Sequence, residues 1–361
     1  MKKTVSILIA LFMLGAFAAG CSPAVNEPES PISSDAPASP APVDPIAPPA
    51  DGGNLLPYDP LRDEKGETVY FELVEIDEAT GKTTYSYRDY HYIVQNADGM
   101  FTVSKRFEGF GKIDILLQGE GLCTLYDIKG TSLVYSVGET FYTMTTDGES
   151  IAEVCTISGY NGEPAPDWYG RHISVTREYL YYLDPNTAKL YKYSLSGGDT
   201  KAEVSPLALK NEKFADCFTM LALVDNAYAY VVNCVENKDN PLEDYTPVNI
   251  SRFSLESGEC DFLIDGRPVN VRANDIYVLS PVFSGDRTLG DGQYSGFTFV
   301  LLSKGEQKVL YEHSFMKAVD YIVTTRTPSA VTVTAGVFAT ENNEKAFTET
   351  VRLNYDGMTV R

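Results

Sequence analysis

The sequence predicts an all-β fold, and more specifically a β-propeller of six or seven four-stranded blades. Short runs of alternating apolar residues, separated by turn residues, extend from residue 69 to the end of the chain. The 24 Tyr and 17 Phe favour strands, in which aromatic side chains pack well. After the N-terminus, we find no stretch of twelve residues with the apolar spacing of an amphipathic helix.

Residues 173–204 show the pattern most clearly. Residues 179–183 form an aromatic run, residues 189–195 alternate between apolar and polar, and residues 201–204 begin another extended run. The turn-forming segments Asp184–Thr187 and Gly197–Asp199 separate these runs, so we expect an antiparallel meander of three strands.

The other predicted strands follow the same reasoning, since each is a short apolar or alternating run bounded by Gly, Asn, Asp or Pro. Before the meander we expect strands at residues 69–76, 83–87, 90–94, 100–105, 113–118, 122–128, 132–137, 140–145 and 150–156. After it we expect strands at residues 217–224, 228–235, 249–255, 260–264, 275–279, 298–303, 308–311, 319–324, 329–338 and 346–354, with a last one from residue 358.

A repeat of turn sequences organises these strands. The turns begin at residues 146, 196, 256, 303 and 355, which are separated by 50, 60, 47 and 52 residues. A period of this length with four strands per unit is typical of a β-propeller, in which each sheet covers the next. We expect six units, or seven if residues 69–76 belong to a blade shared with the C-terminal strands. Tandem β-sandwiches are the alternative, and they would need no common period.

The meander also carries a family resemblance. The segments Tyr179-Leu-Tyr-Tyr-Leu-Asp-Pro185 and Leu190-Tyr-Lys-Tyr-Ser-Leu-Ser-Gly-Gly-Asp199 resemble the repeat of bacterial propellers of unknown function. Those are similar in turn to the tyrosine-rich propellers of lipoprotein receptors, although the Trp-Thr-Asp core of the receptor motif is absent from this sequence. The resemblance implies a fold and no particular ligand.

The N-terminus reads as an export signal with a lipid attachment site. Lys2 and Lys3 precede an apolar run over residues 5–19, which ends at Gly20-Cys21. Residues 1–20 resemble a bacterial lipoprotein signal peptide, although Ala18 stands where that family usually has Leu. The resemblance implies that Cys21 becomes the first residue of the mature chain and carries acyl chains such as palmitate. An ordinary secretory signal is one alternative. A transmembrane anchor is the other, but the apolar run is short and lacks a basic flank.

The next segment, residues 21–57, reads as a disordered tether before a propeller domain at residues 58–361. It holds nine Pro between Pro23 and Pro49 and a tenth at Pro57, and no Lys or Arg occurs in it. Such a segment cannot bury enough apolar surface to offset its ordering entropy, and its Pro content makes it a semi-extended spacer. A proline-rich ligand for a partner domain is the alternative. We therefore expect a protein on the extracytoplasmic face of the cell membrane, attached through its lipid.

The net charge of −21 bears on partners. A field of this sign repels nucleic acid, so we expect no nucleic-acid partner. A solvated acidic surface explains the charge most simply, and recruitment of a cationic partner or Ca²⁺ is the alternative.

Two cysteines could form a disulfide. If Asp225-Asn226 is a two-residue hairpin loop, Cys217 and Cys234 face each other across the hairpin. Disulfides persist outside the cytoplasm, so a Cys217–Cys234 disulfide is one hypothesis. Two buried thiols are the other, because a single β-bulge would change the register.

Two stretches between predicted strands are long enough to be candidate ligand loops. Residues 158–171 contain Trp168 and Tyr169, and residues 281–296 contain Asp286, Asp291 and Tyr294. Long loops on a rigid scaffold often bind ligands, and aromatic residues with carboxylates suit sugars or peptides. Packing of Trp168 between blades is the alternative.

No motif for catalysis, phosphate or metal binding is recognisable in the sequence, so we name no catalytic residue and expect no metal or cofactor. His91, His172 and His313 stand far apart.

The sequence thus favours an extracytoplasmic lipoprotein that acts as a binding module for a protein or carbohydrate of the cell envelope. The alternatives are a propeller glycoside hydrolase or lyase, with paired carboxylates from separate blades, and an assembly scaffold of the envelope.

Overall fold

The computed structural model divides the chain into two compact units, Met1–Asn54 and Leu55–Arg361. It describes residues 70–109, 111–160, 172–196, 202–203, 209, 218–225, 227–236, 245–272, 274–284, 293–327, 329–337 and 347–360. All of these residues belong to the second unit.

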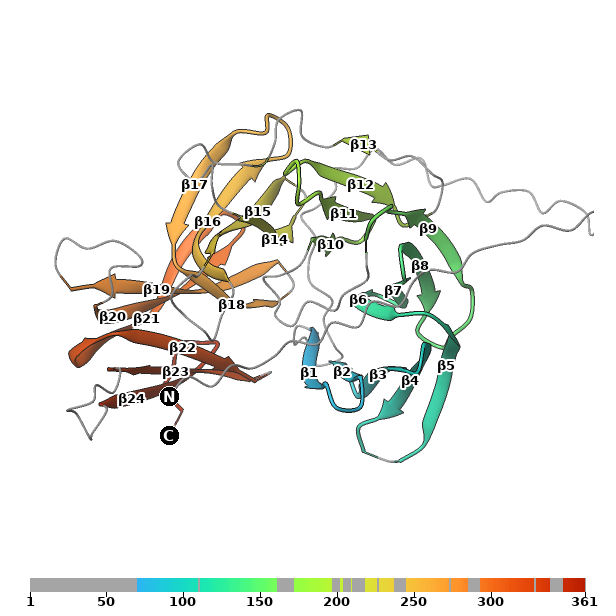
Figure 1. The fold of residues 1–361 in the computed structure, drawn as a ribbon, viewed down its shortest axis with the longest axis horizontal. Coiled ribbons are helices and arrows are strands. Elements are labelled where there is room, and N and C mark those ends of the chain that lie inside the picture. The colour runs from blue at the N-terminus through green and yellow to red at the C-terminus, as the bar shows by residue number, and fades with distance from the viewer. Residues whose placement is uncertain are drawn as a thin grey trace, which may run out of the picture. The chain divides into compact units, whose positions relative to one another are not determined.

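Within these ranges the strands form six antiparallel sheets that follow one another along the chain (Figure 1). The first three sheets are β1 (Phe71–Asp77), β2 (Lys82–Tyr87), β3 (Tyr90–Ala97), β4 (Met100–Phe107) and β5 (Ile113–Glu120); β6 (Cys123–Lys129), β7 (Ser132–Val137), β8 (Thr140–Thr145) and β9 (Ala152–Thr156); and β10 (Ile173–Val175), β11 (Tyr179–Leu183), β12 (Leu190–Ser194) and β13 (Ala202–Glu203). The last three are β14 (Phe218–Val224), β15 (Tyr228–Glu236), β16 (Tyr245–Ser254) and β17 (Cys260–Asp265); β18 (Arg267–Arg272), β19 (Asp275–Phe283), β20 (Tyr294–Ser303) and β21 (Glu306–Val319); and β22 (Tyr321–Arg326), β23 (Ala330–Gly336) and β24 (Thr348–Asn354).

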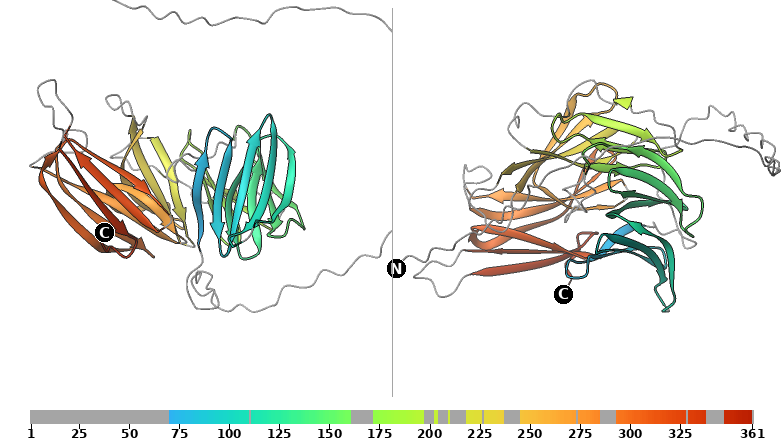
Figure 2. Two further views of the ribbon diagram at one scale, coloured as in Figure 1. Left: turned by 90° about the horizontal axis from the view of Figure 1, so that it is seen from below. Right: turned by 45° about the vertical axis from the view of Figure 1, so that its right-hand side comes forward.

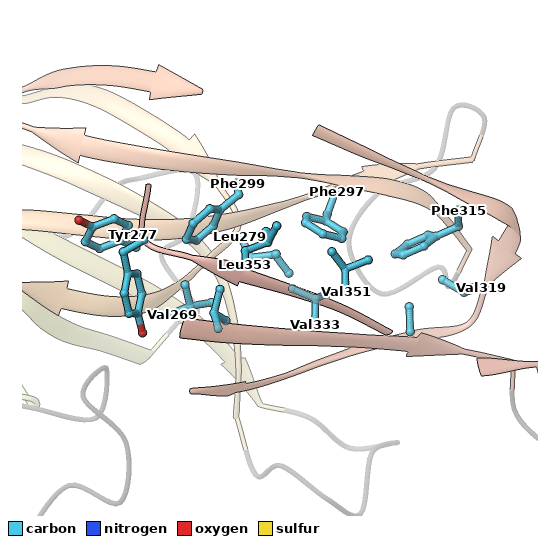
Figure 3. Close-up of a cluster of buried hydrophobic side chains, with 13 residues drawn as sticks. Val269, Tyr277, Leu279, Phe297, Phe299, Phe315, Val319, Val333, Val351 and Leu353 are labelled. Atoms are coloured by element: carbon cyan, nitrogen blue, oxygen red, sulfur yellow. The ribbon is translucent and has the colours of Figure 1, made fainter. Parts of the chain in front are cut away.

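Buried apolar clusters join each sheet to the next, which confirms the predicted propeller. Every sheet turns a face towards its neighbour, as Figure 2 shows from two further directions. Five clusters fill the successive interfaces, and Figure 3 shows the cluster between the fifth and sixth sheets. Representative pairs across them are Tyr92 with Leu133, Phe141 with Leu180, Leu183 with Val231, Ile250 with Val278, and Phe299 with Val333.

The first and last sheets depart from the four-stranded pattern. β2–β5 correspond to the four strands of the other sheets, and β1 is an additional strand on the inner edge, paired with β2 from Phe71↔Tyr87 to Asp77↔Lys82. The expectation that residues 69–76 could share a blade with the C-terminal strands is therefore wrong. In the sixth sheet the bridge Leu353↔Thr359 stands in place of a fourth strand.

A tyrosine repeat explains part of the aromatic composition. In the first, third and fourth sheets one strand begins Tyr-x-Tyr, and a basic side chain from the neighbouring strand lies over the first ring. Each of these rings thus packs in the sheet and makes a cation–π contact with the basic side chain. The distances from cation to ring centroid are 4.0 Å for Lys105–Tyr90, 4.8 Å for Lys192–Tyr179 and 4.3 Å for Arg252–Tyr228.

The connections between sheets set the direction of the inner strands. Gly121-Leu122, Gly266 and Asp320 lead from the outer strand of one sheet straight into the inner strand of the next. The inner strands β6, β10, β14, β18 and β22 also contact one another in order. They therefore begin at the same end of the ring. The five longest connections between strands, residues 157–172, 204–217, 237–244, 284–293 and 337–347, all join strands at this end. We call it the long-loop end, and the opposite one the short-turn end.

Candidate binding surface at the long-loop end

Both predicted ligand loops start and finish at the long-loop end. Residues 158–171 lie between β9 and β10, and residues 284–293 separate β19 from β20. Trp168, Tyr169, Asp286 and Asp291 lie outside the described residues. The strand directions nevertheless bring the roots of both loops to one end of the ring, although they are more than a hundred residues apart in the sequence.

Tyr294, the one predicted ligand residue that the structure describes, is half-buried at the root of the second loop. Its ring centroid lies 5.4 Å from that of Phe283, and it packs against the cluster between the fifth and sixth sheets. Burial raises the pKa of the Tyr294 hydroxyl, and the nearby Arg267 opposes that rise. Tyr294 thus helps to fix the strands from which the loop departs.

Tyr160 fixes the root of the first loop. Its hydroxyl lies 2.7 Å from that of Tyr126, which in turn lies 3.0 Å from Ser136 Oγ. The Tyr160 ring also meets the Tyr182 ring edge-on, with 6.3 Å between centroids. Burial raises the pKa of Tyr126 well above its usual value, so this hydrogen-bonded group is uncharged over the physiological range.

A histidine–glutamate pair lies between the fifth and sixth sheets near the same end. His313 Nε2 is 2.7 Å from Glu349 Oε1, and the side chains are 17% and 16% exposed. Met316 N donates to Glu349 Oε2 over 3.2 Å, and the Tyr311 hydroxyl lies 3.5 Å from His313 Nδ1. In the neutral imidazole with its hydrogen on Nε2, Nδ1 would be the acceptor for the Tyr311 hydroxyl. The carboxylate therefore orients an imidazole that can exchange a proton or bind a polar group.

Sequence reasoning missed this pair. His313 gave no ligand spacing, because Glu349 lies 36 residues away and on another sheet. The surroundings add aromatic and apolar contacts: the rings of Phe297 and Phe315 both lie 5.3 Å from the imidazole, while Met316 is 81% exposed. This corner offers a polar dyad beside an exposed apolar side chain, a combination that suits a sugar or a peptide.

The cysteine register differs from the expected one. Cys234 is buried and faces Phe218 across the hairpin, because the register shifts between Leu221 and Leu223. Asp225 N also donates to Tyr228 O, so the hairpin closes one residue later than the Asp225-Asn226 loop assumed. Cys217 lies outside the described residues, as does Cys21, and the disulfide remains a prediction without support from the register.

Among the residues that the structure describes, no three His, Cys, Asp or Glu side chains gather closely enough to hold a metal ion. The same part of the chain contains no helix that is both long and apolar enough to span a bilayer.

Comparisons with known proteins do not assign a family. No protein-family model matches the chain, and no curated protein is detectably similar in sequence. Three solved structures illustrate the similar folds found. BamB from Moraxella catarrhalis is 12% identical, with a TM-score of 0.35 and coverage of 82% of this chain and 77% of that chain. An uncharacterised protein from Listeria monocytogenes EGD-e is 9% identical, with a TM-score of 0.40 and coverage of 84% and 85%. The WD40 domain of SCAP from fission yeast is 10% identical, with a TM-score of 0.35 and coverage of 80% and 88%.

The described strands define the class of protein: a β-propeller of six blades with an additional inner strand.

Proposed function

We propose that the protein is an extracytoplasmic lipoprotein, anchored through Cys21, whose propeller binds a protein or carbohydrate of the cell envelope at the long-loop end. The observation that carries the proposal is the gathering of the five longest connections at one end of the ring. Loops can vary and form contacts without disturbing a rigid scaffold. Between the described strands, the connections at the short-turn end have seven residues or fewer.

The loop composition supports this choice of ligand. The first loop brings Trp168 and Tyr169, the second brings Asp286 and Asp291, and the His313–Glu349 pair lies at the same end. Aromatic faces suit the apolar faces of sugars, and carboxylates accept hydrogen bonds from hydroxyl or amide groups.

A loop exchange tests the location of the binding surface. In the full chain, residues 285–292 are replaced by a Gly-Ser turn, and residues 197–200 at the short-turn end are replaced in the same way as a matched control. We expect the first variant to lose at least ~10-fold in affinity for partners captured from envelope extract, since losing ~1.4 kcal/mol of contacts has this effect. The control should bind like the wild type. Equal binding by all three proteins would place the surface elsewhere.

The anchor has an independent test. Mass spectrometry of the mature N-terminus should find a diacylglyceryl-modified peptide that begins at Cys21, and Cys21→Ser should release the protein from membranes. An unmodified peptide, or one that begins elsewhere, would contradict the anchor and leave the binding surface untouched.

The His313–Glu349 pair favours an enzyme as the second candidate, of the glycoside hydrolase or lyase class. A carboxylate-oriented imidazole is a suitable general base or acid. If so, the wild type should degrade a polysaccharide from a panel, His313→Asn should abolish the activity, and Glu312→Gln, on an exposed neighbour, should preserve it. Activity that survives in His313→Asn would exclude this role.

A further inference from the structure

The inner strand β1 carries an ion pair to a distant sheet. Glu72 Oε1 lies 2.7 Å from Arg272 Nε at the end of β18, and each side chain is 15% exposed. The two residues belong to the first and fifth sheets. Among the described strands β1 pairs only with β2, so Glu72 sits on an edge strand and reaches out of its own sheet.

The fifth and sixth sheets build a receptor around this carboxyl group. The Arg272 guanidinium lies 4.1 Å from the Tyr355 ring centroid and 4.9 Å from that of Tyr70. The Tyr355 hydroxyl donates to Thr327 O over 3.1 Å, which holds the ring in place. A planar guanidinium held over the Tyr355 ring is pre-organised to receive a carboxylate, whereas Tyr70 directly precedes β1 and moves with Glu72.

Arg326, at the end of β22, supplies a second cation. Its Nη1 donates to Asn270 Oδ1 over 3.2 Å, and its charge acts on the Glu72 carboxyl together with that of Arg272. The two arginines thus come from the neighbouring inner strands β18 and β22, whereas the carboxyl group comes from the additional inner strand of the first sheet.

We propose that the short-turn ends of β18 and β22 form a binding site for carboxyl groups, which the chain fills with its own Glu72. The ligand class is a small carboxylic acid or a sugar acid or peptide that presents a carboxyl group. Glu72 acts as an internal competitor: the site opens to an added ligand when β1 withdraws or when this side chain is shortened. The site lies at the end of the ring opposite to the proposed partner-binding loops, so it is independent of them.

The charged surroundings of Glu72 define how the site responds to pH. Across the first sheet Glu72 is paired with Ser86, and Ser86 is paired with His91, whose Nδ1 lies 3.2 Å from Arg106 Nη2. Arg272, Arg326 and the Tyr355 hydroxyl group face it from the other sheets. Burial raises the pKa of Glu72, and the two arginines offset this only in part. A carboxyl group therefore enters at a desolvation cost, and a ligand should bind more tightly at pH 5 than at pH 8.

Chemical rescue of Glu72→Ala tests the proposal with acetate as the probe. Thermal unfolding of the full chain is followed in sodium acetate and in sodium chloride of equal ionic strength. We expect acetate to raise the Tm of Glu72→Ala by about 2 °C relative to chloride, and more at pH 5 than at pH 8, because a ligand that binds only the folded state stabilises it. The wild type and Glu72→Gln, whose side chains still fill the site, should show no such difference.

The matched control is Glu72→Ala combined with Arg272→Met, which removes the principal cation and should abolish the rescue. An equal response of all four proteins to acetate, or none in a folded Glu72→Ala variant, would overturn the proposal. If the alanine variant does not fold, Glu72→Thr provides the same test, since threonine suits a strand and also lacks the carboxyl group.

Discussion

Single side chains in this protein join parts of the chain that the sequence keeps far apart. Glu72 and Arg272 are 200 residues apart, and His313 and Glu349 lie on different sheets. Composition identified aromatic and acidic loops, and it placed Tyr294 in one loop, whereas Tyr294 is the first residue of β20. Composition could not reveal the Glu72–Arg272 or the His313–Glu349 pair, because these pairs depend on how the first, fifth and sixth sheets meet.

The raised pKa of Glu72 predicts a pH dependence of stability. Its ordinary value is near 4.5, and in the folded protein burial favours the protonated form. The stability that this group contributes is therefore fully present below pH 4.5 and is lost as the pH rises through the raised pKa. Glu72→Gln mimics the protonated state. The free energy of unfolding of the wild type minus that of Glu72→Gln should therefore be lower at pH 8 than at pH 4.

Urea unfolding of both proteins at the two pH values measures this difference, and groups common to both cancel. A difference that is independent of pH, or one that favours the wild type at pH 8, would contradict the assignment.

At the level of strands, the alternation of apolar residues predicted most elements and missed two. β10 (Ile173–Val175) has only three residues, and β18 (Arg267–Arg272) begins and ends with arginine and contains Pro268. Both are inner strands, buried by neighbouring sheets, and neither carries a periodic signal of its own. The Cys234 register was wrong for a related reason: a bulge is a local shift that alternation does not reveal.

The Asn96 side chain, near the end of β3, links the first sheet to the second by hydrogen bonds. Its Nδ2 donates to Cys123 O and its Oδ1 accepts from Cys123 N, each over 2.9 Å, so the side chain completes the backbone of β6. Asn96→Ala should cost about 2 to 3 kcal/mol, because two backbone groups lose their partner. Asn96→Asp keeps the acceptor alone and should lie in between. Urea unfolding measures both, and a loss below about 0.5 kcal/mol for the alanine variant would show that water replaces the amide.

At the scale of the whole molecule, the spacing of turns predicted the ring. The five repeated turn sequences join the last two strands of the second to sixth sheets, the C-terminal segment standing in for the last strand of the sixth. Their period follows from the number of strands in a blade. The additional strand β1 and the gathering of long connections at one end do not follow from the period, because they depend on strand direction and not on strand count.

Five interfaces in series predict cooperative unfolding. Leu133, between the first two sheets, and Leu353, between the last two, are both 0% exposed. Leu133→Ala and Leu353→Ala should each cost about 2 to 5 kcal/mol by leaving a cavity. Each should also shift one common transition in near- and far-ultraviolet circular dichroism. Two separate transitions in either variant would show that the sheets melt independently.

The antiparallel alignment of β1 has a mechanical consequence. β1 begins at the short-turn end and pairs with β2 over its whole length. The proposed partner would bind at the opposite, long-loop end. Tension between a lipid at Cys21 and such a partner would pull β1 along its own axis. The hydrogen bonds of an antiparallel pair lie across that axis, so the ladder would be sheared as a unit and not peeled bond by bond. A protein held this way should resist dragging forces better than its thermal stability alone implies.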